Sequence, residues 1–342
     1  MDLLRLPETD PLKIYRYRDG LFGVEMLITA VVHFDFFTWL ATQPSTKAQI
    51  CQHFGLADRP VDTMLTFLTA LKLIRAQNGM FEVTALAREH LVKGSQWFLG
   101  PYYASLADRP VCKDLVQVLK TDKAANWGSV KTAKEWATAM QEPNFAESFT
   151  AAMDCRGTYL GAAMAKQLDL TGRSRMLDIA GGSGIYSCAT VTHHPHIKAT
   201  VLERPPVNEI AQQHLNKRGF SDRVSVVAVE MFTEAWPTGY DVHLISNVLH
   251  DWDFPKVRPL LAKSFAALEP GGLLVIHDAF INADKTGPLA VAEYSVLLMH
   301  STEGKCYSTA EMSELLTEAG FRDFKYSDTA VDRGIMTAHK PR

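Results

Sequence analysis

The chain has 342 residues, which exceeds the usual span of a single hydrophobic core and favours two domains. Hydrophobic residues at 47% and charged residues at 21% are ordinary for a globular protein. The 35 Lys and Arg residues against 38 Asp and Glu residues give a formal charge of -3, which provides no electrostatic basis for binding nucleic acid or an anionic membrane. A small or neutral partner is therefore expected.

The five cysteines lack CxxC spacing, so the sequence predicts neither a zinc site nor a disulfide framework. We expect reduced thiols in a cytoplasmic protein and no metal. The first residues include the acids Asp2, Glu8 and Asp10 and lack the basic-then-apolar pattern of a signal peptide. The apolar stretch from Leu21 to Leu40 is interrupted by charged residues, which predicts a buried helix rather than a membrane span.

Apolar residues recur at helical spacing from Leu21 to Leu73, and breaks near residues 43–45 and 55–60 divide them into three helices. Two strand-like runs follow, residues 73–76 and 80–84, on either side of a turn. Three helices and a hairpin are typical of a winged helix. The pattern predicts a winged-helix-like domain of residues 1–100, followed by a helical linker of residues 101–170 that contributes to a substrate pocket.

After Arg175 short apolar strands alternate with helices. This alternation predicts a parallel sheet with helices on both faces, a Rossmann-like α/β domain of residues 171–342. The predicted strands are residues 176–179, 199–203, 224–229, 242–246, 273–277, 321–327 and 334–339, and the predicted helices are residues 186–193, 206–218, 255–268 and 308–319.

Residues 176–184 form a strand that runs into a glycine-rich turn, where glycine lets the backbone approach a ligand closely. The spacing departs from G-x-G-x-x-G, which argues against a dinucleotide. Glu203 ends the second strand, where an acid can accept hydrogen bonds from both hydroxyls of a ribose. Glu230 and Met231 end the third strand and could frame an adenine. Together these strand ends predict a nucleoside site at the carboxyl edge of the sheet.

These segments resemble the class I S-adenosylmethionine-dependent small-molecule O-methyltransferases of the caffeate and acetylserotonin type, which include many bacterial enzymes. The resemblance runs from about Leu21 to the C-terminus, and its most specific segment is Leu249-His250-Asp251-Trp252. The other matching segments are residues 81–84, 91–95, 149–156, 177–184, 230–232, 269–272 and 304–305. The resemblance implies methyl transfer from S-adenosylmethionine to a hydroxyl of a small aromatic acceptor in secondary metabolism. S-Adenosylhomocysteine would be the product, and the N-terminal domain would form a homodimer.

The same resemblance assigns cofactor contacts. The glycine turn would lie against the methionine moiety, Glu203 would bind the ribose, and Glu230 with Met231 would face the adenine. Ser246 occupies a position that is often lysine in the family. Arg156 could pair with the methionine carboxylate, or be a solvent-exposed helical arginine. The full predicted set is Asp178, Gly181, Gly182, Glu203, Glu230, Met231, Ser246 and Arg156.

His250 is the predicted general base, since a neutral imidazole can take the acceptor's proton as its oxygen attacks the sulfonium methyl. Asp278 ends the fifth strand and would orient His250 and stabilise the imidazolium. The predicted substrate contacts are mostly apolar or aromatic, although several could simply fill the core at helical spacing. They are Phe149, Met153, Trp252, Tyr294, Leu298 and Met299.

One residue departs from the family pattern. Cys306 follows Gly304-Lys305 where the plant enzymes carry a second acid that holds the catalytic histidine, so the base should depend more on Asp278. Related alternatives are C-methylation or hydroxylation of an aromatic or polyketide-like substrate with the same fold and cofactor.

Two alternatives from other classes are a winged-helix DNA-binding regulator and an NAD-dependent oxidoreductase. The regulator is disfavoured because residues 1–100 contain 10 basic and 10 acidic residues. The oxidoreductase is disfavoured by the missing third glycine.

Overall fold

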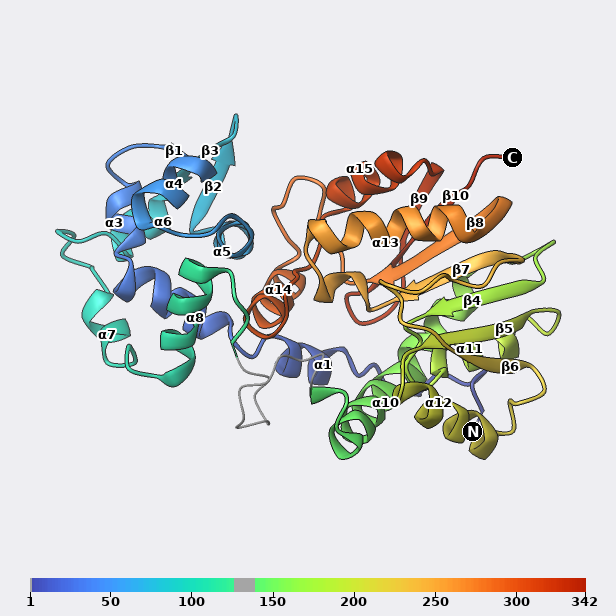
Figure 1. Cartoon of the computed structure of the whole chain (residues 1–342). Coiled ribbons are helices and arrows are strands. Elements are labelled where there is room, and N and C mark those ends of the chain that lie inside the picture. Colours follow the sequence, from blue (N-terminus) through green and yellow to red (C-terminus); the bar gives the residue numbers. More distant parts are fainter. Residues whose placement is uncertain (1, 126–138) are drawn as a thin grey trace. The chain divides into compact units, whose positions relative to one another are not determined.

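The computed structural model describes residues 2–125 and 139–342 and divides into two compact units, which are described separately (Figure 1). Unit 1 consists of Met1–Lys13, Ala133–Phe280 and Thr309–Arg342, and unit 2 of Ile14–Thr132 and Ile281–Ser308. The segment Ile281–Ser308 thus groups with the helical unit, although the sequence places it in the predicted domain of residues 171–342. Within the predicted linker, residues 126–138 lie outside the described residues. The functional division into three domains stays a prediction.

Unit 1 is built on a seven-stranded sheet with the order β6-β5-β4-β7-β8-β10-β9 (Figure 1). The first five strands in this order are parallel, and β10 is antiparallel to both of its neighbours. Central strands such as β4 and β7 are almost entirely buried, which is why they read as continuous apolar runs. The strands are β4 (Arg175–Ile179), β5 (Lys198–Glu203), β6 (Val224–Ala228), β7 (Tyr240–Ser246), β8 (Leu268–Asp278), β9 (Arg322–Asp328) and β10 (Gly334–His339).

Helices cover both faces of this sheet. On one face lie α10 (Pro143–Gln167), α11 (Ile185–His193) and α12 (Val207–Arg218), and on the other α13 (Phe254–Ala267) and α15 (Thr309–Ala319) (Figure 1). A Cβ atom on Gly157 of α10 would lie 2.4 Å from Cγ2 of Ile185, the first residue of α11. Glycine therefore lets α10 pack directly on the start of α11, which is the end of the glycine-rich turn.

The structure confirms the predicted α/β alternation, and the last two strands, β9 and β10, form an antiparallel pair beside the parallel strands. The observed strand ends differ from the predicted ones by at most two residues, except that β8 begins at Leu268 instead of residue 273. The extension arises because Leu268 pairs with Tyr240 before a register shift in the β7–β8 ladder. Pro270, Gly271 and Gly272 hid this irregular start of the strand from the sequence pattern.

Unit 2 is mostly helical, and its first predicted helix is broken. The chain forms α2 (Gly23–Ile28), a π-helical turn (Thr29–His33) and α3 (Phe36–Leu40), because Asp35 adopts a left-handed conformation with a φ of 48°. The predicted hairpin is present as β2 (Ile74–Gln77) and β3 (Met80–Val83), and β3 also pairs with the short β1 (Ser45–Thr46). The winged-helix assignment itself stays a prediction.

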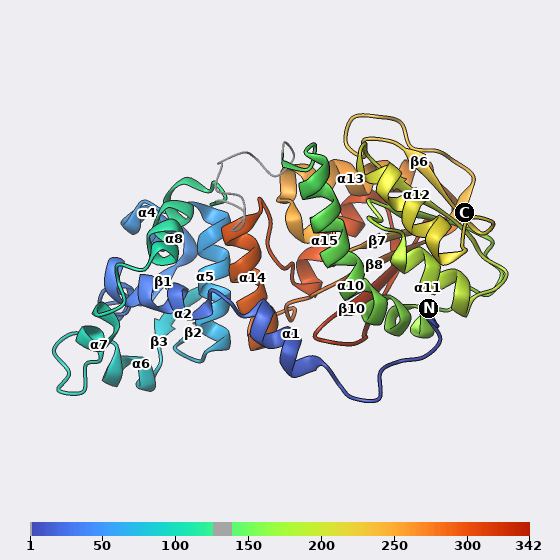
Figure 2. The ribbon, with the colours of Figure 1, turned by 90° about the horizontal axis from the view of Figure 1, so that it is seen from below.

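The helix α14 (Leu289–Ser301) lies alongside α5 (Asp58–Ala70) in this unit (Figure 2). The other helices are α1 (Leu12–Asp19), α4 (Lys47–Phe54), α6 (Ala85–His90), α7 (Gly100–Ala104) and α8 (Pro110–Thr121). Among the helices of residues 2–125 and 139–342, none combines the length and apolarity that crossing a membrane requires.

Candidate active site at the carboxyl edge of the sheet

The glycine-rich turn between β4 and α11 uses its two central glycines for different reasons. A Cβ atom on Gly181 would lie 2.6 Å from the carboxyl group of Asp178, so no larger residue fits without displacing that side chain. Gly182 has a φ of 58°, and nothing lies within 4 Å of where its Cβ would be. The turn therefore presents bare backbone on an open face, which is what a closely bound ligand requires.

Two buried carboxyl groups surround this turn. Asp178 accepts a hydrogen bond from Ser187 Oγ at 2.7 Å, while its Oδ1 is buried with no hydrogen-bond partner among the described residues. Glu203 accepts hydrogen bonds from the N–H groups of Gly182 at 3.1 Å and Arg204 at 2.9 Å. Burial raises the pKa of each group to about 7. Both carboxyl groups would gain from further hydrogen-bond donors, and hydroxyl groups of a ribose are donors of this kind.

The turn is also held from α10. Ser183 Oγ donates to Asp154, whose other carboxyl oxygen accepts a hydrogen bond from Arg218 of α12. The sequence did not single out these residues, because they are brought together only by the packing of α10 and α12 against the turn.

The end of β6 carries the predicted adenine contacts. The carboxylate of Glu230 accepts hydrogen bonds from the N–H groups of Phe232 and Thr233, both at 3.2 Å, so it shapes its own loop. The Met231 carbonyl accepts hydrogen bonds from Trp236 Nε1 and Lys263 Nζ, both at 2.9 Å, and its side chain is half-buried. Both residues lie in a loop that is firmly fixed by its own contacts.

The structure places His250 and Asp278 in direct contact. His250 lies in a 3-10 turn (Leu249–Asp251) after β7, and Asp278 is the last residue of the neighbouring parallel strand β8. His250 Nδ1 is hydrogen bonded to Asp278 Oδ1, and both residues are only 4% exposed. The other ring nitrogen, Nε2, lies 3.7 Å from Asp251 Oδ1. One ring nitrogen of His250 is therefore hydrogen bonded to Asp278, and the other lies on the side of Asp251.

The charge state of Asp278 follows from its neighbours. Burial acts to raise its pKa, but the charge of His250 and hydrogen bonds from His250 and the Ala279 N–H hold that pKa below its ordinary value, and the charge of Arg333 adds to this effect. Burial raises the pKa of Asp251 to about 6. The site thus separates an ionised carboxylate from one that titrates close to neutrality.

A polar network lies beside this pair. Ser246 Oγ is 2.9 Å from His277 Nδ1, and Asn247 donates to Tyr186 OH at 3.1 Å and to Ser246 Oγ at 3.0 Å. Burial lowers the pKa of His277 to about 3, so its ring is neutral. Asn247 adopts a positive φ of 54°, which turns the chain from β7 toward His250. The hydroxyl group of Ser246 therefore forms hydrogen bonds with neighbouring residues of the same sheet edge.

Arg156 on α10 is half-buried. Burial raises the pKa of Tyr186 and of Asp251 and lowers that of His277, and the charge of Arg156 acts to lower all three. These effects place Arg156 among the groups at the carboxyl edge. A fully solvent-exposed arginine, the alternative from the sequence, does not describe this residue.

The predicted substrate residues belong to both units. In unit 1, Phe149 packs against Phe145 and a cluster that contains Met140, while Met153 is half-buried on the same helix. The ring of Trp252 lies 4.9 Å from that of Phe232, which places it beside the loop of the predicted adenine contacts.

In unit 2, Tyr294, Leu298 and Met299 are all buried in α14, with Met299 fully inaccessible. Cys306 is buried in the same unit, and its N–H donates to Ser295 Oγ at 3.0 Å. The neighbouring Lys305 forms an ion pair with Asp62 of α5. Lys305 and Cys306 therefore fix the chain that follows α14.

Three neighbouring histidines at the end of α11 have specific contacts. His193, His194 and His196 each place Nε2 within 3.0 to 3.2 Å of a backbone carbonyl. These three histidines therefore stabilise the local fold. In the part of the chain that the structure describes, no group of three or more His, Cys, Asp or Glu side chains is arranged to hold a metal ion.

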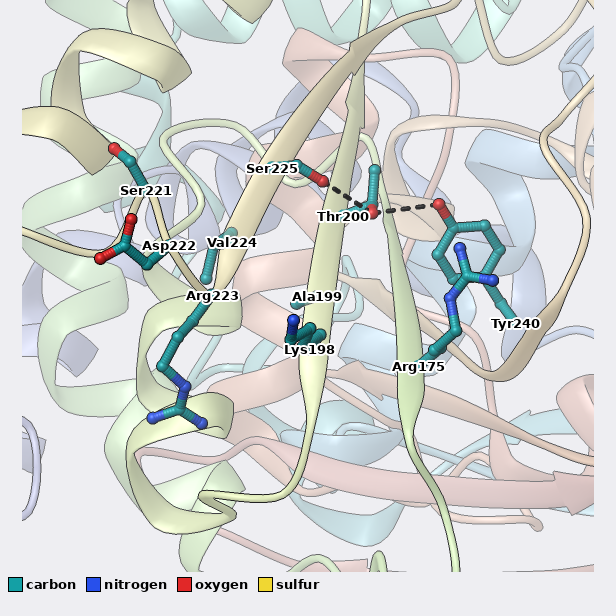
Figure 3. Close-up of a pocket in the computed structure, with 10 residues that line it drawn as sticks. All are labelled: Arg175, Lys198, Ala199, Thr200, Ser221, Asp222, Arg223, Val224, Ser225 and Tyr240. Carbon is teal, nitrogen blue, oxygen red and sulfur yellow. Dashed lines mark hydrogen bonds between the residues drawn. The ribbon is translucent and has the colours of Figure 1, made fainter.

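A separate pocket of about 210 Å³ lies at the opposite, amino edge of the sheet (Figure 3). Its two arginines are already engaged: the Arg175 guanidinium lies 4.8 Å from the Tyr240 ring centroid, and Arg223 donates to four backbone carbonyls. Tyr240, Thr200 and Ser225 form a chain of hydroxyl hydrogen bonds. This pocket is distinct from the carboxyl-edge site.

An open glycine turn and ordered acids at the carboxyl edge, next to a histidine–aspartate pair, define a nucleoside-dependent transferase of the class I methyltransferase fold. A family model described as O-methyltransferase domain matches residues 112–322. The chain belongs to this family and is an S-adenosylmethionine-dependent O-methyltransferase. The chain is therefore assigned to this family and not to the DNA-binding regulators or the NAD-dependent oxidoreductases.

Known relatives include an O-methyltransferase and a C-methyltransferase. The 3-hydroxy-5-methyl-1-naphthoate 3-O-methyltransferase of Streptomyces sahachiroi is 30% identical over 303 residues, which cover 88% of this chain and 86% of that enzyme. The L-tyrosine C(3)-methyltransferase of Streptomyces lavendulae is 29% identical and covers 88% and 85% of the two chains. The crystal structure of an O-methyltransferase family 2 protein from Planctomyces limnophilus in complex with apigenin superimposes with a TM-score of 0.90 at 31% identity, covering 99% of each chain.

Proposed function

We propose that this enzyme methylates a hydroxyl group of a small aromatic molecule, with His250 as the general base. The observation that carries the proposal is the hydrogen bond between His250 Nδ1 and the ionised Asp278 at the carboxyl edge that also bears the glycine turn. S-Adenosylmethionine, when bound, supplies an electrophilic methyl group on a sulfonium sulfur.

The residues at the edge suit this cofactor. The open face at Gly182 and the exclusion of a side chain at Gly181 leave room for the methionine moiety. Glu203 would accept hydrogen bonds from the ribose, and its raised pKa indicates that further donors are favourable there. Asp178 would stabilise the turn through its hydrogen bond with Ser187. We assign Glu230 and Met231 to the adenine side and Arg156 to the methionine carboxylate, with Ser246 as a less direct neighbour.

The base acts through one tautomer. Because the ionised Asp278 can only accept, Nδ1 carries the hydrogen and the lone pair of the ring lies on Nε2. Nε2 would take the proton of the acceptor hydroxyl as its oxygen forms the bond to the methyl carbon, while the bond from that carbon to the sulfonium sulfur breaks and S-adenosylhomocysteine is left. The carboxylate of Asp278 then stabilises the imidazolium, and positioning of the acceptor supplies much of the remaining rate.

The relatives support an aromatic acceptor, since one acts on a hydroxynaphthoate and a solved structure contains apigenin, which is a flavonoid phenol. We assign Phe149, Met153, Trp252, Tyr294, Leu298 and Met299 to the acceptor, as apolar or aromatic side chains for a flat ring. Transfer to an aromatic carbon is the alternative outcome, because another relative is a C(3)-methyltransferase of tyrosine.

The test is to incubate the purified protein with S-adenosylmethionine and a panel that contains apigenin, 3-hydroxynaphthoate and tyrosine, and to locate the new methyl group by NMR. A methyl ether as the main product supports the proposal. A C-methyl product, or no turnover of any phenol in the panel, would contradict it.

We also propose a homodimer formed through unit 2 and a cytoplasmic location. Four large apolar side chains are strongly exposed between residues 14 and 24: Ile14 at 75%, Tyr17 at 88%, Leu21 at 58% and Val24 at 63%. Apolar side chains this exposed, close together in the sequence, favour burial against a second copy. The cytoplasmic location rests on the five unpaired cysteines.

A further inference from the structure

We propose that Arg333 is a positioning residue whose permanent charge keeps Asp278 ionised while His250 is neutral, and so fixes the His250 tautomer that can accept a proton. This inference rests on the proposed function, because the tautomer matters for catalysis only if His250 is the general base. The tautomer itself can be measured without turnover.

Arg333 reaches the site through the register of the sheet. Gly334 of β10 is paired with Asp278 of β8, and Ile335 is paired with His277. Arg333 therefore lies one residue beyond the partner of Asp278, in the turn that joins β9 to β10. Arg333 is 3% exposed, so this turn carries a buried cation next to the end of β8, where Asp278 lies.

The turn holds Arg333 in place. The Thr329 N–H donates to the Arg333 carbonyl at 2.8 Å, and Arg333 Nη1 donates to the Val331 carbonyl at 3.1 Å. Thr329 Oγ1 also lies 3.3 Å from His277 Nε2. The same short turn thus contacts the polar network beside Asp278 and supplies a buried cation to it.

A permanent charge matters because the other cation near Asp278 is conditional. The charge of His250 lowers the pKa of Asp278, but this charge is absent in the neutral state that must accept a proton. Burial then favours protonation of Asp278. A guanidinium remains charged at every working pH and opposes that protonation.

Protonation of Asp278 would reverse the tautomer. A protonated carboxyl group would donate to Nδ1 of a neutral imidazole, and the hydrogen of the ring would then reside on Nε2. Nε2 would have no lone pair for the acceptor proton. Keeping Asp278 ionised is therefore equivalent to keeping the base competent.

Other charged and titratable groups surround the pair and belong in the same balance. Asp251 lies on the Nε2 side of His250, Tyr186 of α11 and His277 feel both Asp278 and Arg333, and Arg156 of α10 acts on Asp251 and His277. The charge of Arg333 acts on Asp278 itself and, like that of His250, lowers the pKa of this carboxyl group.

The experiment compares Arg333→Met with Arg333→Lys, which keeps the charge. The matched control is Arg322→Met, which removes an exposed arginine from the same hairpin. For each protein we would measure kcat/KM against pH, together with ¹⁵N shifts of His250 in the cofactor-bound enzyme without acceptor. If Arg333→Met fails to fold, Arg333→Gln replaces it, because it retains a donor for the Val331 carbonyl without the charge.

We expect Arg333→Met to move the acid limb of the kcat/KM profile, which reports protonation of the coupled His250–Asp278 pair, upward by about one pH unit, so that kcat/KM falls by up to roughly tenfold below that limb and is unchanged at pH 9. The ¹⁵N shifts should show hydrogen on Nε2 at the lower pH. Arg333→Lys and Arg322→Met should resemble the wild type. In an Asp278→Asn background, Arg333→Met should have almost no further effect.

A loss that is equal at every pH, or equal in both backgrounds, would mean that Arg333 is merely structural and would overturn the inference. Unchanged rates and ¹⁵N shifts in Arg333→Met would overturn it as well. If His250 proves dispensable for catalysis, the rates lose their meaning for the proposed function, but the ¹⁵N shifts still decide whether Arg333 sets the tautomer.

Discussion

Replacement of His250 tests the central step of the proposed mechanism, and two variants separate its two roles. His250→Ala removes the proton acceptor and leaves the buried carboxylate of Asp278 with a hydrogen bond from the Ala279 N–H at 2.8 Å. His250→Asn also removes the acceptor, but its amide can still donate toward Asp278. The pair of variants therefore distinguishes loss of the base from loss of the buried hydrogen bond.

The expected magnitudes differ accordingly. Loss of a general base costs roughly 10²–10⁴ in turnover, or about 3–5 kcal/mol of transition-state stabilisation, and applies to both variants. Because both partners are only 4% exposed, leaving Asp278 without His250 should also destabilise His250→Ala by an amount on the order of 3 kcal/mol. His250→Asn should avoid most of that second cost.

The assay combines initial rates with a phenol acceptor, calorimetry with S-adenosylhomocysteine and thermal melting. Both variants should bind S-adenosylhomocysteine with nearly wild-type affinity, and His250→Ala alone should melt well below the wild type. Higher pH should partly restore turnover, since the acceptor hydroxyl then ionises without help. Near-wild-type turnover of His250→Asn at neutral pH would refute the reasoning, because alignment with the cofactor would then suffice.

Four other predictions follow from the same geometry. Asp278→Asn should lose less turnover than His250→Ala, because it disturbs the tautomer and the imidazolium but leaves the acceptor nitrogen; an equal or larger loss in the pH–rate profile would contradict this. Gly182→Val should abolish S-adenosylhomocysteine binding in calorimetry, whereas Gly172→Val, which has a φ of 74° and equally open space, should bind normally despite similar strain. Glu203→Gln should weaken cofactor binding and, in the free enzyme, become more stabilising as pH rises from 5.5 to 8.5. The sign follows because a carboxyl group whose pKa is raised on folding destabilises the folded protein as pH rises from its ordinary pKa of 4.5 toward about 7, and this difference amounts to about 3 kcal/mol at most. Melting curves that shift in parallel at all pH values would count against this prediction. Light scattering should show a dimer at micromolar concentration, and Tyr17→Glu should shift it toward monomer; a wild-type monomer would exclude the dimer.

The sequence by itself determined the sheet of unit 1 and the identity of its edge residues. Strands that are buried on both faces leave continuous apolar runs, and the turn after β4 needs glycine for backbone reasons that are local, so both features are visible without a structure. The same locality explains why Glu203, His250 and Asp278 could be placed at strand ends, since the carboxyl ends of parallel strands meet at one edge.

Other features were decided by the tertiary structure alone. The left-handed conformation of Asp35, which breaks the first helix of unit 2, has no clear periodic signal. Asp154 and Arg218 meet at the glycine turn only because two helices pack around it. Arg333 lies 55 residues beyond Asp278 in the sequence, and only the antiparallel register of β8 and β10 brings it there. Hydrogen-bond register and helix packing join residues that are distant along the chain, so the balance of charge around His250 exists only once the sheet has formed.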